Sequence, residues 1–469
     1  MDNEKLNLQT KLAYGAGDFG PAVTANVALF YLLLFFTNVA GIPPGLAGSI
    51  LMIGKVWDAV NDPIVGLLTD KTTSRRWGRR LPWMFYGAIP FGIFFFLQWI
   101  VPQFNSDQSS NIWPLFWYYV VIGILSQAFF TIVNLPYTAM TPELTQDYDE
   151  RTSLNSFRFT FSIGGSISSL IFAQVVFSVI TEPQQQYLIL AAICTVISVL
   201  SLYWCVYGTR DRILAFEAKR SKLEQSAQTP FWQQIKVAFS NKPFLFVIAI
   251  YLFSWLGVQI TATVIPFFVI YCMKLKNVDV PTVLIAVQGT ALLMLSIWSY
   301  LSKKIGKKIV YFLGMSLWII AASGLFFLQP NQIGLMYFMA IMAGCGVSTA
   351  YLIPWSMIPD VIELDELLTG ERREGIFYGF MVLLQKFGLA FGLFLVGNAL
   401  QTFGFQEVIP GQAAPIQPDS ALFAIRIIIG PIPTICLIIG LIFTFFYPIT
   451  REMHAEIMLK LQQKREKDI

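Results

Sequence analysis

The chain has 469 residues, of which 55% are hydrophobic and only 13% are charged. This composition is too apolar for a water-soluble protein of that length, and it excludes a chain built mainly of soluble domains. The formal net charge of +4 does not indicate a nucleic-acid partner, because the basic residues lie in short loops between apolar runs.

Apolar runs of about 20 residues, each long enough to cross a hydrocarbon core of about 30 Å, recur along the chain and number about twelve. They predict an all-α membrane protein in contact with membrane lipid. The polar N-terminus has no small-residue cleavage pattern behind it, so we expect no removable signal peptide. The expected spans are 18–40, 45–70, 81–101, 112–137, 157–181, 186–208, 242–272, 281–302, 308–328, 333–356, 375–402 and 421–447.

Domain organisation follows from the longest charged interruption of these runs, residues 209–241. It predicts a cytoplasmic linker between an N-terminal six-helix bundle, 1–208, and a C-terminal six-helix bundle, 242–448, followed by a cytoplasmic tail, 449–469. Apolar residues between 231 and 239 favour an interfacial amphipathic helix in this linker. A soluble regulatory segment is the alternative.

Basic residues cluster in the loops after the second, sixth and eighth spans, and the opposite loops are nearly bare. The positive-inside rule then places both termini in the cytoplasm, and we expect the chain in the plasma, or inner, membrane. The loop Arg-Arg-Trp-Gly-Arg-Arg at 75–80 is echoed by Lys-Lys-Ile-Gly-Lys-Lys at 303–308, and Glu143 after the fourth span by Asp360 after the tenth. Two related halves around a midplane binding site are typical of transporters.

The second span carries three charged residues, Lys55, Asp58 and Asp62, spaced so that they share one helix face. Each charge at the centre of a span costs about 2.5–3.5 kcal/mol on insertion scales, so it needs a reason to be there. Two carboxylates one turn apart repel each other unless a cation or a proton lies between them. We interpret them as a cation site, because carboxylate oxygens suit hard cations. The alternative is an internal ion-pair cluster that only locks helices together, with Lys55 neutralising one aspartate.

Lys55 and four further residues are candidates for substrate binding or coupling. Lys386 lies well inside an apolar run and needs an anionic partner from another helix. Asp18 and Arg158 lie near the starts of their spans, where water can reach them, so each alone is weaker evidence. Tyr351 is a candidate for lining a central cavity, with ordinary packing as the alternative.

Other chemistry has little support in the sequence. The five cysteines are scattered through apolar runs and are interpreted as packing residues, and the single histidine, His454, lies in the tail. Residues 15–20 match the dinucleotide-binding glycine pattern but open a transmembrane run, so close helix packing is the better interpretation. With no nucleophile–base motif we expect no enzyme, and no cofactor or metal besides Na⁺ or H⁺ as coupling ion.

Three segments resemble the glycoside-pentoside-hexuronide:cation symporters of the major facilitator superfamily. They are Lys-Leu-Ala-Tyr-Gly at 11–15, Trp-Asp-Ala-Val-Asn-Asp-Pro at 57–63 and Trp-Gly-Arg-Arg-Leu-Pro-Trp at 77–83. The resemblance implies the major facilitator fold, with about twelve helices in two six-helix bundles. It also implies cation-coupled symport of a small-molecule substrate, a sugar or glycoside, by alternating access; we expect a monomer.

The resemblance also assigns roles to individual residues. Asp58 and Asp62 correspond to the second-helix carboxylates that bind the coupling cation, and Thr131 to a fourth-helix threonine of the same site. Arg158 corresponds to a fifth-helix sugar-site arginine, and Lys386 to an eleventh-helix lysine near the cation.

The chain departs from this pattern where the melibiose permeases of the family bind sugar. Asn134 and Thr138 stand in place of a fourth-helix aspartate and a sugar-stacking tryptophan, and Ala22 in place of a first-helix aspartate. Asn134 thus joins the expected cation site as a neutral ligand. Galactoside specificity is not implied, and animal lysophospholipid symporters share the architecture, so a lysophospholipid or another amphipathic solute is the alternative cargo. The residues do not choose between sodium and proton.

Overall fold

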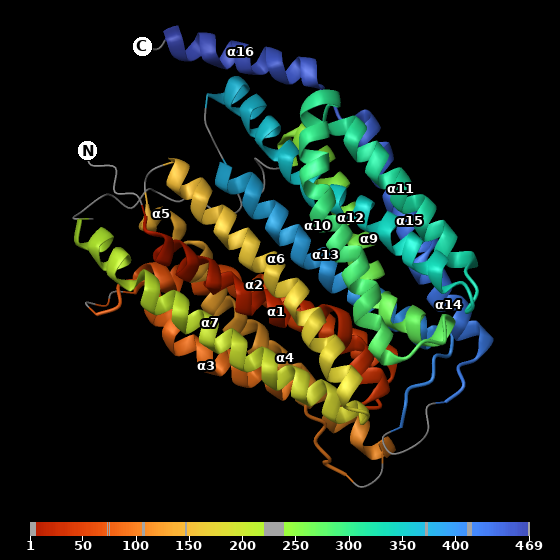
Figure 1. The fold of residues 1–469 in the computed structure, drawn as a ribbon. Coiled ribbons are helices and arrows are strands. Elements are labelled where there is room, and N and C mark those ends of the chain that lie inside the picture. Colours follow the sequence, from red (N-terminus) through yellow and green to blue (C-terminus); the bar gives the residue numbers. More distant parts are fainter. Residues whose placement is uncertain are drawn as a thin grey trace. The chain divides into compact units, whose positions relative to one another are not determined.

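The computed structural model describes residues 6–72, 74, 76–105, 108–145, 148–219, 239–370, 374–409 and 415–467. All regular elements within these ranges are helices (Figure 1). Ten of them, counting continuous pairs as one, are long and apolar enough to cross a membrane. The predicted all-α membrane class is therefore confirmed.

The N-terminal half supplies six long helices. Of these, α2 is long enough to span a bilayer but carries five charged residues, and α3 is apolar but has only 17 residues. An additional short helix, α5, follows α4. The bounds are α1 Leu8–Asn38, α2 Pro44–Lys71, α3 Leu81–Leu97, α4 Gln108–Thr138, α5 Thr141–Leu144, α6 Tyr148–Val179 and α7 Pro183–Lys219.

In the C-terminal half, the last expected span is broken in two at Gly430. Pro431 begins the second piece, because a proline has no N–H to continue the hydrogen bonds of the preceding helix. The bounds are α9 Lys242–Phe267, its π-helical continuation η1 Phe268–Cys272, η2 Asn277–Asp279, α10 Val280–Ile305, α11 Lys307–Phe327, α12 Ile333–Thr369, α13 Glu374–Thr402, α14 Asp419–Ile429, α15 Pro431–Phe446 and α16 Arg451–Lys467.

The chain divides into two compact units. Unit 1 consists of residues 1–225 together with 276–282 and 397–418, and unit 2 consists of 226–275, 283–396 and 419–469. The sixth long helix, α7, continues to Lys219 and so passes the expected end of the first bundle at 208. Residues 220–238, which hold most of the predicted amphipathic helix, lie outside the described residues.

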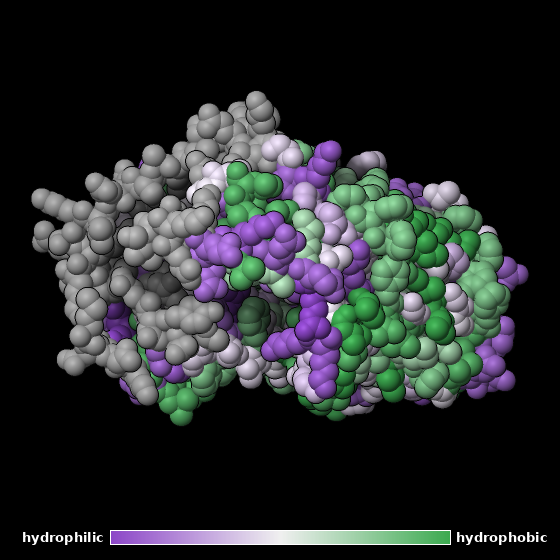
Figure 2. All heavy atoms as spheres, turned by 90° about the horizontal axis from the view of Figure 1, so that it is seen from above, coloured by the Kyte–Doolittle hydropathy of each residue, from purple (hydrophilic) through white to green (hydrophobic). Residues whose placement is uncertain are grey.

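Apolar side chains cover broad areas of the surface seen in Figure 2. Exposed apolar side chains occur on helices of both units, for example Leu200 on α7 and Ile297 on α10. In water such surfaces would be unfavourable, whereas helices that face lipid require them.

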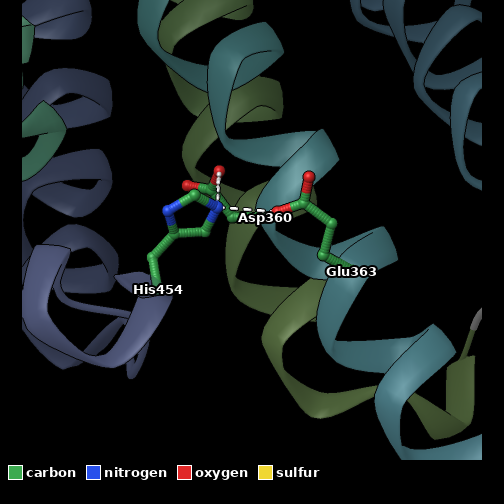
Figure 3. Close-up of side chains that lie close together, drawn as sticks. All are labelled: Asp360, Glu363 and His454. Atoms are coloured by element: carbon green, nitrogen blue, oxygen red, sulfur yellow. Dashed lines mark hydrogen bonds and ion pairs between the residues drawn. The ribbon is translucent and has the colours of Figure 1, made fainter. Parts of the chain in front are cut away.

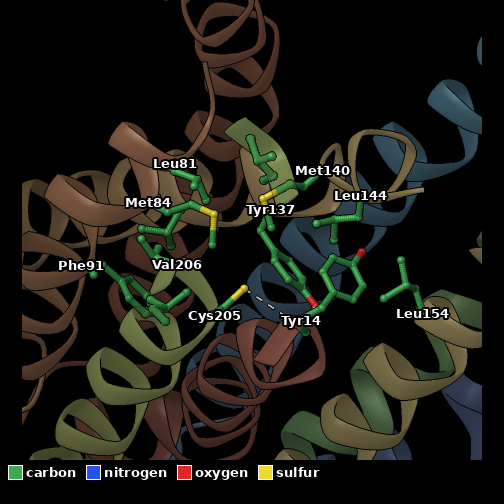
Figure 4. Close-up of a cluster of buried hydrophobic side chains, with 14 of the residues drawn as sticks. Tyr14, Leu81, Met84, Phe91, Tyr137, Met140, Leu144, Leu154, Cys205 and Val206 are labelled. Atoms are coloured by element: carbon green, nitrogen blue, oxygen red, sulfur yellow. Dashed lines mark hydrogen bonds between the residues drawn. The ribbon is translucent and has the colours of Figure 1, made fainter. Parts of the chain in front are cut away.

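A cluster of buried aromatic and aliphatic side chains packs helices of unit 1 together (Figure 4). The rings of Tyr14 and Tyr137 stack with centroids 5.1 Å apart, and Tyr137 Oη donates to the Tyr14 carbonyl oxygen at 2.8 Å. A Cβ added to Gly17 would lie 2.7 Å from Cys205 Sγ, so only glycine allows this approach. The glycine pattern of residues 15–20 therefore serves helix packing, as the sequence predicts.

The two repeated basic segments share a glycine conformation and an ion pair. Gly78 and Gly306 both have positive φ values, 70° and 90°, which a residue with a side chain rarely adopts. Arg79 pairs with Glu143 in unit 1, and Lys307 Nζ lies 2.7 Å from Asp360 Oδ1 in unit 2. The repeated sequence motif thus corresponds to an equivalent ion pair in each unit.

Candidate functional site

Two helices of unit 1, α2 and α4, bring the predicted cation ligands together. They run side by side in the same direction, since Lys55 Nζ donates to Gln127 Oε1 at 3.1 Å and, one turn further along both helices, Asp58 meets Thr131. Lys55, which the ion-pair alternative assigns to the carboxylates, therefore has at least one bond to a neutral group.

Thr131 lies between the two carboxylates. Its Oγ1 is 2.8 Å from Asp58 Oδ1 and 3.2 Å from Asp62 Oδ1. A hydroxyl group has one proton to donate, so it can satisfy only one of these oxygens. The contact between Thr131 Oγ1 and the other carboxylate oxygen becomes favourable when a proton or a cation lies between the two oxygens. Asp58 is only 3% exposed, so water screens the charges at this point only weakly.

Asn134 adds a fourth oxygen on the same face of α4, three residues after Thr131. Its Oδ1 is buried and has no hydrogen-bond partner among the described residues. Buried carbonyl oxygens are nearly always bonded, so an orphaned one on the helix face that also carries Thr131 is a position where a cation would be favourable. The residues present therefore fit an oxygen-coordinated cation.

A second polar pair joins α1 to α6. Arg158 Nε lies 3.2 Å from Asp18 Oδ2, and both side chains are largely buried. The Arg158 guanidinium carbon is also 5.8 Å from the centroid of the Tyr137 ring. Sequence reasoning selected Asp18 and Arg158 separately, and the structure brings them together as one ion pair.

Tyr351 and Lys386 belong to unit 2. Tyr351 on α12 is 40% exposed, and its ring centroid is 5.4 Å from that of Trp255 on α9. Trp255 in turn contacts Tyr251 at 5.7 Å. Sequence reasoning missed these two α9 aromatics, although their i, i+4 spacing was a visible sign of a shared face. Lys386 lies half-buried on α13.

The chain is similar to known proteins over nearly its whole length. Residues 13–451 match the family model described as MFS/sugar transport protein. The chain is 49% identical to the uncharacterized symporter sll1374 of Synechocystis sp., over 99% of this chain and 98% of that relative. It is 29% identical to the sodium-dependent lysophosphatidylcholine symporter 1 of Xenopus tropicalis, over 98% of this chain and 91% of that relative.

Solved structures show the same fold at low sequence identity. The nucleoside transporter NupG matches with a TM-score of 0.61 and 14% identity, covering 94% of this chain and all of that one. A bacterial homologue of the human lysosomal transporter Spinster, inward-facing and unoccupied, matches with a TM-score of 0.64 and 13% identity, covering 97% of both chains. The architecture is thus that of major facilitator transporters.

Proposed function

Because this chain belongs to the MFS/sugar transport protein family and is a membrane symporter, we propose that it moves a small solute together with Na⁺ by alternating access. Asp58, Asp62, Thr131 and Asn134 hold the coupling ion. The protein works as a monomer in the plasma membrane. Both of its termini lie in the cytoplasm, an orientation that the basic loops support.

One observation carries the choice of a sodium ion, namely the buried and unbonded Asn134 Oδ1 on the face of α4 that also carries Thr131. A proton shared between Asp58 and Asp62 would relieve their repulsion but would leave this carbonyl oxygen without a partner. Na⁺ is a hard cation that takes several oxygen ligands at once. The relative from Xenopus tropicalis is sodium-dependent by name, which supports the same choice.

Two solute classes compete for the transported cargo. A sugar or glycoside is supported by the description of the matching family and by the polar pair Asp18–Arg158, which can bond hydroxyl groups. A lysophospholipid is supported by relatives of that specificity and by the absence of sugar-site side chains at positions 22, 134 and 138.

The test is uptake by proteoliposomes containing the purified protein. Labelled glycosides and labelled lysophospholipids are supplied separately, under an inward sodium gradient or under a pH gradient alone. We expect accumulation of one solute class, and only with the sodium gradient. Equal accumulation under the pH gradient without sodium would contradict sodium coupling, and no accumulation of either class would redirect the search for the solute.

Replacing Thr131 by Val is expected to weaken the apparent affinity for sodium. A hydrogen bond to a charged group contributes roughly 1.5–3 kcal/mol, which predicts a roughly tenfold to hundredfold loss. The matched control is Thr138→Val on the same helix, since Thr138 Oγ1 only donates to the Leu135 carbonyl. Uptake against sodium concentration measures both. Thr131→Ser should retain affinity, and equal effects of the two valine variants would place Thr131 outside the site.

Replacing Asn134 by Asp is expected to strengthen the sodium dependence of transport. The variant adds one negative charge at short range, where charge–charge interactions reach about 4 kcal/mol at an effective dielectric of about 20. Uptake is measured against sodium concentration at fixed pH. Asn105→Asp, in an exposed loop of the same unit, controls for the added charge. An unchanged or weaker sodium response in a well-folded Asn134→Asp protein would show that position 134 does not face the ion.

A further inference from the structure

Three side chains of unit 2 with metal-ligand chemistry lie close together. Asp360 and Glu363 lie three residues apart on α12, and His454 projects toward them from α16 (Figure 3). Their ligand atoms all lie within 4.8 Å of one another. This group joins two helices that are separated by about 90 residues of sequence, and the symport mechanism does not use it.

The geometry approaches that of a tetrahedral metal site. Zinc–nitrogen and zinc–oxygen bonds of about 2.0–2.2 Å place neighbouring ligand atoms roughly 3.4 Å apart. His454 Nε2 lies 3.4 Å from Asp360 Oδ1, which already matches. Its distance to Glu363 Oε2 is 2.6 Å, so the flexible Glu363 carboxylate must withdraw slightly to admit an ion. The His454 side chain is 34% exposed, which leaves a path for the ion and room for a water ligand.

Neighbouring groups hold the ligands in place. Lys307 Nζ donates to both Asp360 oxygens at 2.7 Å and to the Ser356 carbonyl at 2.6 Å, and such outer partners orient ligating carboxylates. The buried Ile457 and Leu461 anchor α16 by apolar packing. Two carboxylates and one lysine leave a net charge of −1 before a metal binds.

We propose that Asp360, Glu363 and His454 bind a divalent first-row transition-metal ion, with Zn²⁺ as the probe, and that this ion fastens α16 to α12. Mixed nitrogen and oxygen ligands suit Zn²⁺ better than they suit Mg²⁺ or Ca²⁺. In unit 1 the carboxylate equivalent to Asp360 is Glu143, which bonds Arg79 and Arg80. Both units therefore contain this ion pair, and unit 2 has the proposed metal ligands His454 and Glu363 in addition.

The test is zinc binding to the full chain, purified in detergent without a polyhistidine tag. His454 is the only histidine in the sequence, so His454→Ala removes all imidazole ligands. Equilibrium dialysis at micromolar Zn²⁺ should give one ion per chain, and Co²⁺ should give a tetrahedral absorption spectrum. Both signals should disappear in His454→Ala, and affinity should fall at least tenfold in Glu363→Gln.

The matched control is Glu456→Gln on the same helix, where an exposed carboxylate pairs only with Lys460 among the bonds described. It should bind zinc as the natural chain does. Binding that persists in His454→Ala, as the cysteines could provide, would overturn the proposal. So would the absence of stoichiometric binding, which would leave the cluster as a hydrogen-bonded network that needs no metal. The readout is independent of solute uptake and therefore of the proposed transport function.

Discussion

Replacing Asp58 by Asn is expected to abolish solute accumulation driven by a sodium gradient while leaving the protein folded in the membrane. Asp58 is nearly inaccessible and accepts the Thr131 hydroxyl at 2.8 Å. Its charge is worth about 4 kcal/mol to a cation about 4 Å away at an effective dielectric of about 20, which corresponds to roughly a thousandfold loss of sodium affinity. An amide is isosteric with the carboxylate, so helix packing is preserved.

Two measurements check this expectation. Sodium binding to the purified variant should be undetectable at concentrations that saturate the natural chain, and proteoliposomes should show no concentrative uptake. Exchange of labelled for unlabelled solute, which requires no gradient, reports whether the solute site is intact. Asp419→Asn, an exposed carboxylate in the first turn of α14, provides the same substitution outside the site. Normal concentrative uptake by Asp58→Asn would remove Asp58 from the coupling mechanism.

Replacing Glu143 by Gln is expected to slow transport more than it weakens solute affinity. Glu143 on the short helix α5 is 4% exposed and bonds both Arg79 and Arg80, which directly precede α3. Removing one partner from a buried ion pair costs about 3–5 kcal/mol, because the remaining charge loses a close opposite charge. The pair fixes the loop that leads from α2 against α5, which follows α4, and the helices α2 and α4 hold the proposed cation ligands. The maximal rate of uptake should therefore fall at least tenfold.

The double variant Arg79→Gln, Arg80→Gln removes the cationic partners of Glu143 and should lower the maximal rate of uptake in the same way. Arg210→Gln is the matched control, because the Arg210 guanidinium stacks 4.8 Å from the Trp77 ring on the same loop and has no described bond to Glu143. Initial rates against solute concentration separate rate from affinity. An intact maximal rate with lost affinity would assign the loop to the solute site.

Hydropathy and the spacing of residues along the sequence were enough to predict the membrane helices and part of the candidate site. Runs of about 20 apolar residues are sufficient to identify membrane helices, because lipid forces each segment to satisfy its own backbone hydrogen bonds. The one-turn spacing of Asp58 and Asp62 was enough to place both carboxylates on one face. Gly78 and Gly306 occupy the same position in the two repeated basic motifs. These features depend on residues close together in the sequence, where helical periodicity is a reliable guide.

The tertiary structure decided which distant groups meet wherever the resemblance did not supply the partner. Thr131 lies 73 residues from Asp58, and the resemblance, not the periodicity of either helix, assigned it to the same site. Arg158 lies 140 residues from Asp18, and nothing in the periodicity of either helix selects that partner. The same holds for His454, whose position in a charged tail suggested no site until α16 packed against α12. Such pairs depend on which faces of two helices pack together and at what register, and this is a property of the folded chain because side-chain packing over both whole helices determines it.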